Sequence, residues 1–143
     1  MVDPYNLQRF VDPQSNIFDY VLAEIRAGEK RGHWMWFFFP QLKGLGHSPA
    51  SQYYGIGSLD EARAFLDHPV LGKNLRQCVE ALLPWRHDRT AVQILGSVDT
   101  IKLRSSLTLF DQIAPGDVFN RALDGFFGGQ RDERTLALLN GQA

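Results

Sequence analysis

The sequence has a single cysteine and no strong excess of charge of either sign. One cysteine, Cys78, can form neither an intramolecular disulfide nor a cysteine-based zinc site, which favours a reducing cytoplasm. The 15 basic and 16 acidic residues give a formal net charge of -1, whereas nucleic-acid binding generally needs a basic face that releases counterions. We therefore expect a cytoplasmic protein without a nucleic-acid partner.

Long hydrophobic runs and targeting signals are also missing. The opening residues, MVDPYNLQRF, do not join a basic region to an apolar one, as a signal peptide does. The longest apolar run, residues 34–39, is far shorter than the roughly 20 residues of a membrane-spanning helix. We therefore expect a soluble protein without a membrane partner.

The patterns that mark common cofactor and metal sites do not occur. There is no glycine-rich dinucleotide or phosphate loop, no His-Glu-x-x-His segment and no nucleophile elbow. The four histidines are spread along the chain, so only folding could bring them together around a metal. The sequence therefore predicts no cofactor and no metal, and it identifies no catalytic residue.

The rest of the composition is typical of one globular domain. Hydrophobic residues make up 44% and charged residues 22% of the 143 residues, whereas disordered chains have fewer aromatic residues and more net charge. A chain of this length can bury one core but is short for two, and no repeat or linker divides it. We expect a single helical domain over residues 1–143.

Apolar spacing predicts that nearly all of this domain is helical. Apolar residues recur at helical intervals in six longer segments, near residues 15–27, 58–67, 69–83, 97–113, 117–127 and 132–139. Shorter helical segments are predicted at 4–12, 49–54 and 91–95. We expect an all-α fold, a compact single-domain array of about six to eight helices.

Capping residues predict where several of these helices begin and end. Ser58 followed by Glu61 is typical of a capping box, and Gly28 lies where a terminating glycine is common. Proline should end the first helix at Pro13 and open another at Pro69. In the helix that Ser97 is expected to cap, the predicted core residues are Ile101, Leu107 and Phe110, with Leu103 and Ile113 near the same face.

Residues 30–46, KRGHWMWFFFPQLKGLG, are the most unusual stretch of the chain, and we refer to them as the aromatic segment. As a strand, this segment would need a sheet covered on both faces, and the chain offers few partner strands. A buried helical turn or an irregular segment is favoured instead. It should end at Phe39, because a residue before proline is disfavoured in helical geometry.

The first candidate binding cluster belongs to the aromatic segment. Aromatic faces beside cationic and amide groups can stack on a planar ring and hold an anion. The alternative is that the rings are core, the two leading cations are solvated, and the histidine only caps a turn. The residues concerned are Lys30, Arg31, His33, Trp34, Trp36 and Gln41.

The second candidate cluster lies on the helix predicted at 97–113. Two cations and three hydroxyls within two turns can bind phosphate or carboxylate through charge-assisted hydrogen bonds. Alternatively, this is a solvated face whose hydroxyls bond to carbonyls of their own helix. The residues concerned are Lys102, Arg104, Ser105, Ser106 and Thr108.

Several short segments occur along the sequence in a fixed order, namely Lys30-Arg31-Gly32-His33-Trp34-Met35-Trp36, Phe39-Pro40-Gln41, Gly44-Leu45-Gly46, Glu61-Ala62, His68-Pro69, Leu71-Gly72, Lys102-Leu103-Arg104-Ser105-Ser106 and Thr108-Leu109-Phe110. This ordered set resembles the bacterial family known as domain of unknown function 1810. The resemblance extends over about residues 3–139, and it implies a compact, mainly α-helical domain without any established activity.

These observations lead to two functional hypotheses. In the first, one pocket binds a small anionic molecule, for instance a nucleotide-like one, and whether it is turned over is open. Its expected ligand-binding residues are His33, Trp34, Trp36, Gln41, Lys102, Arg104 and Ser105. In the second, the chain is a protein-interaction or homo-oligomerisation module that binds through aromatic surfaces such as Phe126 and Phe127. A cleft with convergent polar groups favours the first hypothesis, and a contiguous exposed apolar patch favours the second.

Overall fold

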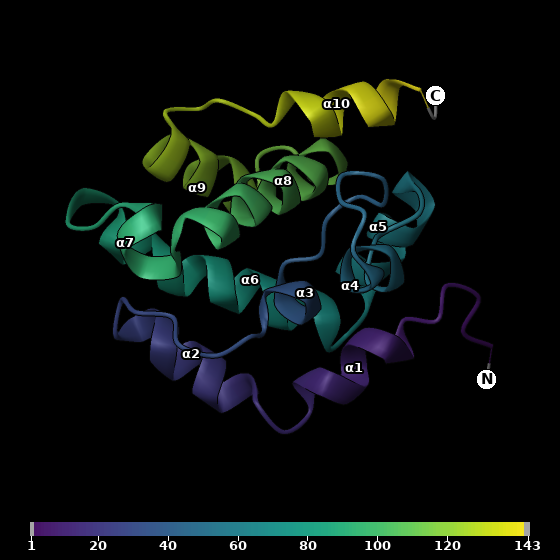
Figure 1. The fold of residues 1–143 in the computed structure, drawn as a ribbon, viewed down its shortest axis with the longest axis horizontal. Coiled ribbons are helices and arrows are strands. Elements are labelled where there is room, and N and C mark those ends of the chain that lie inside the picture. The colour runs from purple at the N-terminus through teal and green to yellow at the C-terminus, as the bar shows by residue number, and fades with distance from the viewer. Residues whose placement is uncertain (1, 142–143) are drawn as a thin grey trace.

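The computed structural model describes residues 2–141, and within that range the chain forms ten α-helices, one 3-10 helix and no strand (Figure 1). The predicted all-α fold is confirmed. The expected number of six to eight helices is too low, because three helices span only four or five residues and leave little periodic signal. The helices are α1 (Gln8–Gln14), α2 (Phe18–Arg26), α3 (Met35–Phe38), α4 (Pro49–Tyr53), α5 (Leu59–Asp67), α6 (Leu71–Leu82), the 3-10 helix (Leu83–His87), α7 (Ala91–Leu95), α8 (Ser97–Ile113), α9 (Val118–Phe127) and α10 (Glu133–Asn140).

Helices α6 and α8 cross the middle of the molecule and contact most of the other helices. Helix α8 packs against α5, α7, α9 and α10, whereas α6 packs against α2, α5 and α9. In Figure 1, α1 and α2 lie on one side of α6, and α10 lies on the opposite side of the molecule beyond α8. Buried hydrophobic residues of these helices form one cluster, whose largest fully buried side chains are Phe10, Phe38, Phe39, Phe65, Phe110 and Phe119.

Capping contacts confirm two of the predicted helix ends. Ser58 Oγ accepts the Glu61 N–H at 3.1 Å and so starts α5, and Gly28 follows α2 with a φ of 72°. The predicted capping box is only half formed. The Glu61 carboxylate instead accepts the Gly57 N–H at 3.0 Å and pairs with Arg9 at 2.6 Å.

The predicted end of α1 at Pro13 is wrong, because the helix continues through this proline to Gln14. Proline removes only one backbone hydrogen bond near the end of a short helix. The extra residue makes a buried contact in return, since Gln14 Nε2 donates to Phe37 O at 2.7 Å. This bond links α1 to α3.

Two predicted helix starts are also corrected. Helix α6 begins at Leu71 and not at Pro69. Pro69 and Val70 form a turn before it, in which His68 Nδ1 accepts the N–H groups of Val70 at 3.1 Å and Leu71 at 3.2 Å. Helix α8 has Gly96 at its N-cap, so Ser97 is the first helical residue and not the cap.

One predicted core residue of α8 is wrong. Leu107 and Phe110 are buried as predicted and Leu103 is buried with them, but Ile101 is 66% exposed. Two residues along a helix correspond to a rotation of about 200°, so Ile101 lies almost opposite Leu103.

No helix within residues 2–141 is both long and apolar enough to cross a bilayer.

The aromatic segment contains the predicted buried helical turn, which is α3. Phe39 leaves helical geometry with φ -125° and ψ 67° directly before Pro40. Trp34, Met35, Phe38 and Phe39 are buried in the main core, whereas Trp36 is only half-buried. The segment therefore sends one side into the core and leaves Trp36 at a surface.

Candidate functional site

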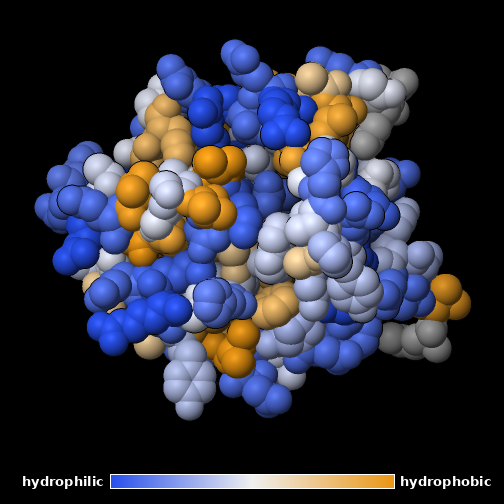
Figure 2. Space-filling view, viewed as in Figure 1, coloured by the Kyte–Doolittle hydropathy of each residue, from blue (hydrophilic) through white to orange (hydrophobic). Residues whose placement is uncertain are grey.

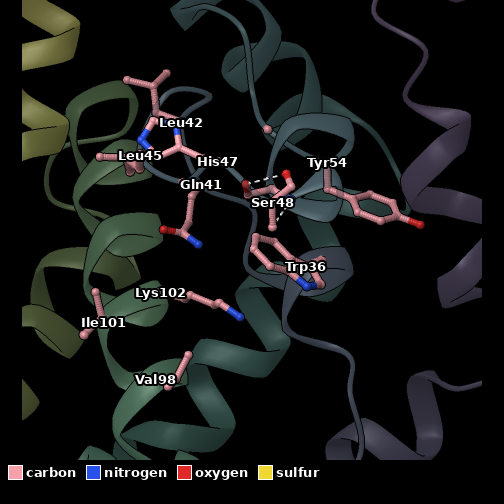
Figure 3. Close-up of a pocket in the computed structure, with 13 residues that line it drawn as sticks. Trp36, Gln41, Leu42, Leu45, His47, Ser48, Tyr54, Val98, Ile101 and Lys102 are labelled. Carbon is pink, nitrogen blue, oxygen red and sulfur yellow. Dashed lines mark hydrogen bonds between the residues drawn. The ribbon is translucent and has the colours of Figure 1, made fainter.

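A cavity of about 370 Å³ opens between α3, the 41–48 segment, α4 and the start of α8 (Figure 3). Its volume is at the lower end of the roughly 300–1,000 Å³ that small-molecule pockets occupy. Among the described residues that line it, Lys102 is the only one with a formal charge. The lining residues are Trp36, Gln41, Leu42, Leu45, Gly46, His47, Ser48, Ser51, Tyr54, Gly55, Val98, Ile101 and Lys102.

Backbone pairing holds one side of the 41–48 segment. Lys43 N donates to Ile56 O at 2.7 Å, and Ile56 N donates to Gln41 O at 2.8 Å. Gly55 permits this close approach, because a Cβ at this position would lie 2.7 Å from Ser51 O and 2.9 Å from Lys43 Cα. The sequence therefore needs glycine here for the cavity wall to form.

Helix α10 holds the other side of the same segment. Arg134 Nη2 donates to Leu45 O at 3.0 Å. Gly44 turns the chain at a φ of 105°, and a Cβ at this position would lie 3.7 Å from Leu138 Cδ1. The wall is thus fixed from both sides, and its side chains are presented on a supported backbone.

A lysine and a tryptophan from distant parts of the sequence meet inside the cavity. Lys102 Nζ lies 4.0 Å from the centroid of the Trp36 ring, at a distance where the ring quadrupole attracts a cation. Lys102 Nζ is also 3.4 Å from Asp99 Oδ1, and Asp99 Oδ2 is 2.7 Å from Lys30 Nζ. One carboxylate therefore faces two ammonium groups, which leaves this trio with an excess of one positive charge.

The Gln41 amide faces the same space. In Figure 3 its side chain points from the 41–48 segment toward Lys102, beside the Trp36 ring. Within residues 2–141 the amide makes no hydrogen bond, in contrast to the Gln41 backbone carbonyl described above. Its donor and acceptor are therefore available to a ligand.

Trp34, only two residues before Trp36, has very different surroundings. It is 3% exposed, and its Nε1 donates to Glu24 Oε1 at 2.8 Å. The same oxygen accepts the N–H groups of Arg31 at 2.9 Å and Gly32 at 3.0 Å. Burial alone would raise the pKa of Glu24, but these hydrogen bonds outweigh it and hold the pKa below its ordinary value.

Three of the seven ligand-binding residues predicted from the sequence line the cavity, namely Trp36, Gln41 and Lys102. The other four, His33, Trp34, Arg104 and Ser105, lie elsewhere. Trp34 is in the core, and His33 is exposed in the bend before α3. The two predicted clusters therefore meet through one residue pair, Trp36 and Lys102, and not as whole clusters.

Arg104 and Ser105 instead hold the connection between α9 and α10. The Arg104 guanidinium donates to Gln130 O at 3.0 Å and to Arg131 O at 2.8 Å. The Ser105 hydroxyl donates to Ile101 O at 3.1 Å and is 3.3 Å from Asp132 Oδ2. The alternative in which these hydroxyls bond to carbonyls of their own helix therefore describes Ser105 better.

Sequence reasoning did not identify most of the apolar wall. Leu42, Leu45, Val98 and Ile101 all line the cavity, but in the sequence they are indistinguishable from core residues. The glycines around Leu45 gave no sign of which helix this part of the chain would face. His47 was also missed, because it follows the aromatic segment without a recognisable motif.

The exposed hydrophobic surface differs from the one expected for an interaction module. Phe126 and Phe127 are half-buried and pack against the core. Exposed apolar side chains occur instead on α7 and the start of α8. They are Val92, Val98 and Ile101, at 52%, 65% and 66% exposure. Figure 2 shows hydrophobic side chains over α7 and the start of α8, beside a hollow in the same face.

Within residues 2–141, no group of three His, Cys, Asp or Glu side chains is arranged to hold a metal ion. Cys78 is buried, and its burial raises the pKa of the thiol well above the ordinary range. A thiol of this kind is a poor nucleophile, because the thiolate is the reactive form.

Comparison with known proteins identifies a family and a similar structure but gives no activity for either. The model of a family described as a protein of unknown function (DUF1810) matches residues 4–139, which confirms the resemblance seen in the sequence. A crystal structure of a conserved hypothetical protein from Mycobacterium tuberculosis is similar, with a TM-score of 0.93 and 46% sequence identity over 96% of this chain and 99% of that one. No curated protein matches the chain.

Proposed function

The chain belongs to the DUF1810 family, and we propose that in this member the cavity beside Trp36 binds a small molecule with an anionic group on a flat apolar body. The observation that carries this proposal is the Lys102 ammonium 4.0 Å from the Trp36 ring, in an otherwise uncharged wall. Binding is proposed, and no reaction is assigned.

The position of Lys102 favours an anionic ligand for an energetic reason. Its side chain is only 19% exposed, so the ammonium has lost much of its hydration. Asp99 compensates only part of this loss, because it is closer to Lys30 than to Lys102. An anion in the cavity would supply the missing partner through a charge-assisted hydrogen bond.

The apolar part of the ligand would lie against the remaining wall. Leu42, Leu45, Val98 and Ile101 offer aliphatic contacts, and the half-buried Trp36 offers an aromatic one. Removing such surface from water contributes about 25 cal/mol per Å². Of the seven residues predicted from the sequence, only Trp36, Gln41 and Lys102 take part in this proposal.

A thermal-shift screen of small carboxylates, phosphate esters and neutral aromatic compounds tests the proposal. At about 100 times its Kd, a ligand adds about 2.7 kcal/mol of stability, which raises the Tm by roughly 8 °C in a domain of this size. Active compounds should stabilise the wild type but not Lys102→Ala. The matched control is Lys73→Ala, which removes an exposed lysine on α6 and should respond as the wild type does.

A screen in which no compound distinguishes the wild type from Lys102→Ala would contradict the proposed function.

A cytoplasmic location is part of the same proposal, and its support is the lack of any second cysteine for Cys78 to pair with.

The second candidate function is protein interaction, and the exposure of Val98 and Ile101 favours it. These residues lie at the cavity edge and present aliphatic surface to solvent. If this surface mediates self-association, light scattering should report a dimer that Ile101→Asp converts to a monomer. A wild-type monomer at high concentration would exclude self-association and leave only a different partner for this surface.

A further inference from the structure

The charges and hydrogen-bond donors of the cavity restrict the kind of anion that it can bind. Lys102 is the only formally charged residue in the described lining, and Asp99 already lies 3.4 Å from its ammonium. Arg104, the second cation expected from the sequence, uses its guanidinium on Gln130 O and Arg131 O. The site therefore offers at most one positive charge in partly desolvated surroundings.

Two hydroxyl groups near the cavity take part in the start of α4. The Ser51 hydroxyl donates to Ser48 O at 2.9 Å, and Ser48, the N-cap of α4, accepts the Ser51 N–H at its Oγ at 3.1 Å. In Figure 3 the Tyr54 hydroxyl points away from Lys102 and Gln41. His47 is exposed to solvent. The Gln41 amide is a neutral donor whose side chain points toward Lys102 (Figure 3).

A phosphate monoester fits this inventory poorly. It carries between one and a half and two negative charges near pH 7 and three strong acceptor oxygens. Lys102 and Gln41 could serve two of those oxygens, and a third oxygen placed against the buried Leu42 side chain would have no donor. A buried acceptor without a partner weakens binding. The hydroxyls of a nucleotide sugar would meet the same apolar wall.

A carboxylate fits the inventory well. It carries one charge and two oxygens, which match the Lys102 ammonium and one N–H of the Gln41 amide. The volume of about 370 Å³ and the aromatic and aliphatic walls suit one or two fused rings beside such a group. We propose that the ligand is an aromatic carboxylic acid, whose carboxylate binds Lys102 and Gln41 and whose ring lies against Trp36. This inference rests on the proposed function and specifies the class of ligand.

Matched probes test the class of anion. Naphthalene-2-carboxylate, naphthalene-2-carboxamide and 2-naphthyl phosphate share one ring system, and the benzene and indole counterparts extend the set. Isothermal titration calorimetry at pH 8, where free histidine is neutral, should show that a carboxylate binds at least about tenfold more tightly than its amide or phosphate ester. That factor is at the lower end of what one charge-assisted hydrogen bond contributes.

Substitutions in the cavity assign the two contacts. Lys102→Ala should weaken carboxylate binding by roughly tenfold to a hundredfold, and Gln41→Leu should weaken it by roughly three- to tenfold. The control is Gln112→Leu, which removes an exposed glutamine near the other end of α8 and should leave the affinity unchanged.

The outcomes separate this inference from the proposed function. If the phosphate ester binds more tightly than the carboxylate, the carboxylate is wrong while Lys102-dependent binding of an anion stands. If the neutral amide binds as tightly as the carboxylate, the charge of the ligand does not contribute, and this result contradicts the proposed function as well. If no probe binds at 10-fold molar excess over millimolar protein, the aromatic-acid class is wrong, and the thermal-shift screen decides the proposed function independently.

Discussion

Trp34 and Trp36 are two residues apart and each has a lysine ammonium near its ring, yet only Trp36 borders a cavity. Lys30 Nζ lies 5.0 Å from the Trp34 ring centroid, and Lys102 Nζ lies 4.0 Å from that of Trp36. Both lysines also contact Asp99. A cation beside an aromatic ring is therefore a structural contact in one case and a candidate binding site in the other.

The difference lies in what surrounds each pair. At Trp34, the indole N–H bonds to Glu24, and the ring packs against Phe38 with centroids 6.0 Å apart. At Trp36, the ring borders a cavity that residues of the 41–48 segment and of α8 also line. Residue identity thus predicts that a tryptophan and a lysine can interact. It does not predict whether space remains for a ligand.

The largest effect that tests this comparison is on stability. Trp34→Ala should lower the free energy of unfolding by about 3–5 kcal/mol, because it empties a fully packed site. Trp36→Ala should lower it by only about 1–2 kcal/mol, since that ring is half-buried and borders a cavity. Urea denaturation followed by circular dichroism measures both values. Equal losses would mean that the two rings do not differ in the way described.

The two lysines should differ in the same direction. Lys30→Met removes an ion pair of 2.7 Å in which the lysine side chain is 7% exposed, and it should cost about 2 kcal/mol. Lys102→Met should cost less than about 1 kcal/mol, because its contact with Asp99 is 3.4 Å long and more exposed. Thermal denaturation at fixed pH and salt compares the two variants. A larger loss for Lys102→Met would contradict the ranking.

The stability that the packed surroundings of Trp34 provide should also depend on pH, because Glu24 accepts the Trp34 indole N–H. Its pKa is lowered on folding, so Glu24 stabilises the fold fully above its ordinary pKa of 4.5 and loses this contribution as the pH falls through the lower folded value. At pH 7, Glu24→Gln should be about 1 kcal/mol less stable than the wild type. The gap should narrow on acidification below pH 4.5. Unfolding curves of both proteins from pH 7 to pH 3 measure this difference in stability. A difference that stays constant over this range would contradict the prediction.

The smallest effect concerns a cation that the sequence placed in the site and the structure places outside it. Arg104→Ala removes two hydrogen bonds to the α9–α10 connection and should cost about 1 kcal/mol or less. It should leave the response to every compound in the thermal-shift screen unchanged. If Arg104→Ala keeps its stability but loses the thermal shift that ligands cause in the wild type, Arg104 takes part in binding and its assignment outside the site is wrong.

The helical fold could be predicted from the sequence because its signals are local. The Ser58 cap, the Gly28 terminator and the spacing of Leu103 and Leu107 each act within one or two turns of chain. Pro13 misled the prediction of the first helix, because the Gln14 contact with α3 connects residues 23 positions apart. Such a contact outweighs a local preference and cannot be seen in a short stretch of sequence.

The candidate site could be predicted only in part, for the same physical reason. Trp36 and Lys102 lie side by side although they are 66 positions apart in the sequence. The sequence identified the cluster that contains each residue but did not establish that the two clusters meet. Whether a polar residue faces the cavity depends on distant partners, as Arg104 demonstrates with the carbonyls of residues 130 and 131. Whether an apolar residue such as Ile101 faces core or cavity depends on helix rotation, which its identity does not specify.

Fluorine NMR of the protein labelled with 5-fluorotryptophan tests the central claim most directly. The three tryptophans give three resonances, which Trp→Phe substitutions assign. Titration with the compound that produces the largest Lys102-dependent thermal shift should move the Trp36 resonance to saturation and leave those of Trp34 and Trp85 in place. A stabilising compound that moves the Trp34 or Trp85 resonance and leaves that of Trp36 unchanged would show that the ligand binds elsewhere.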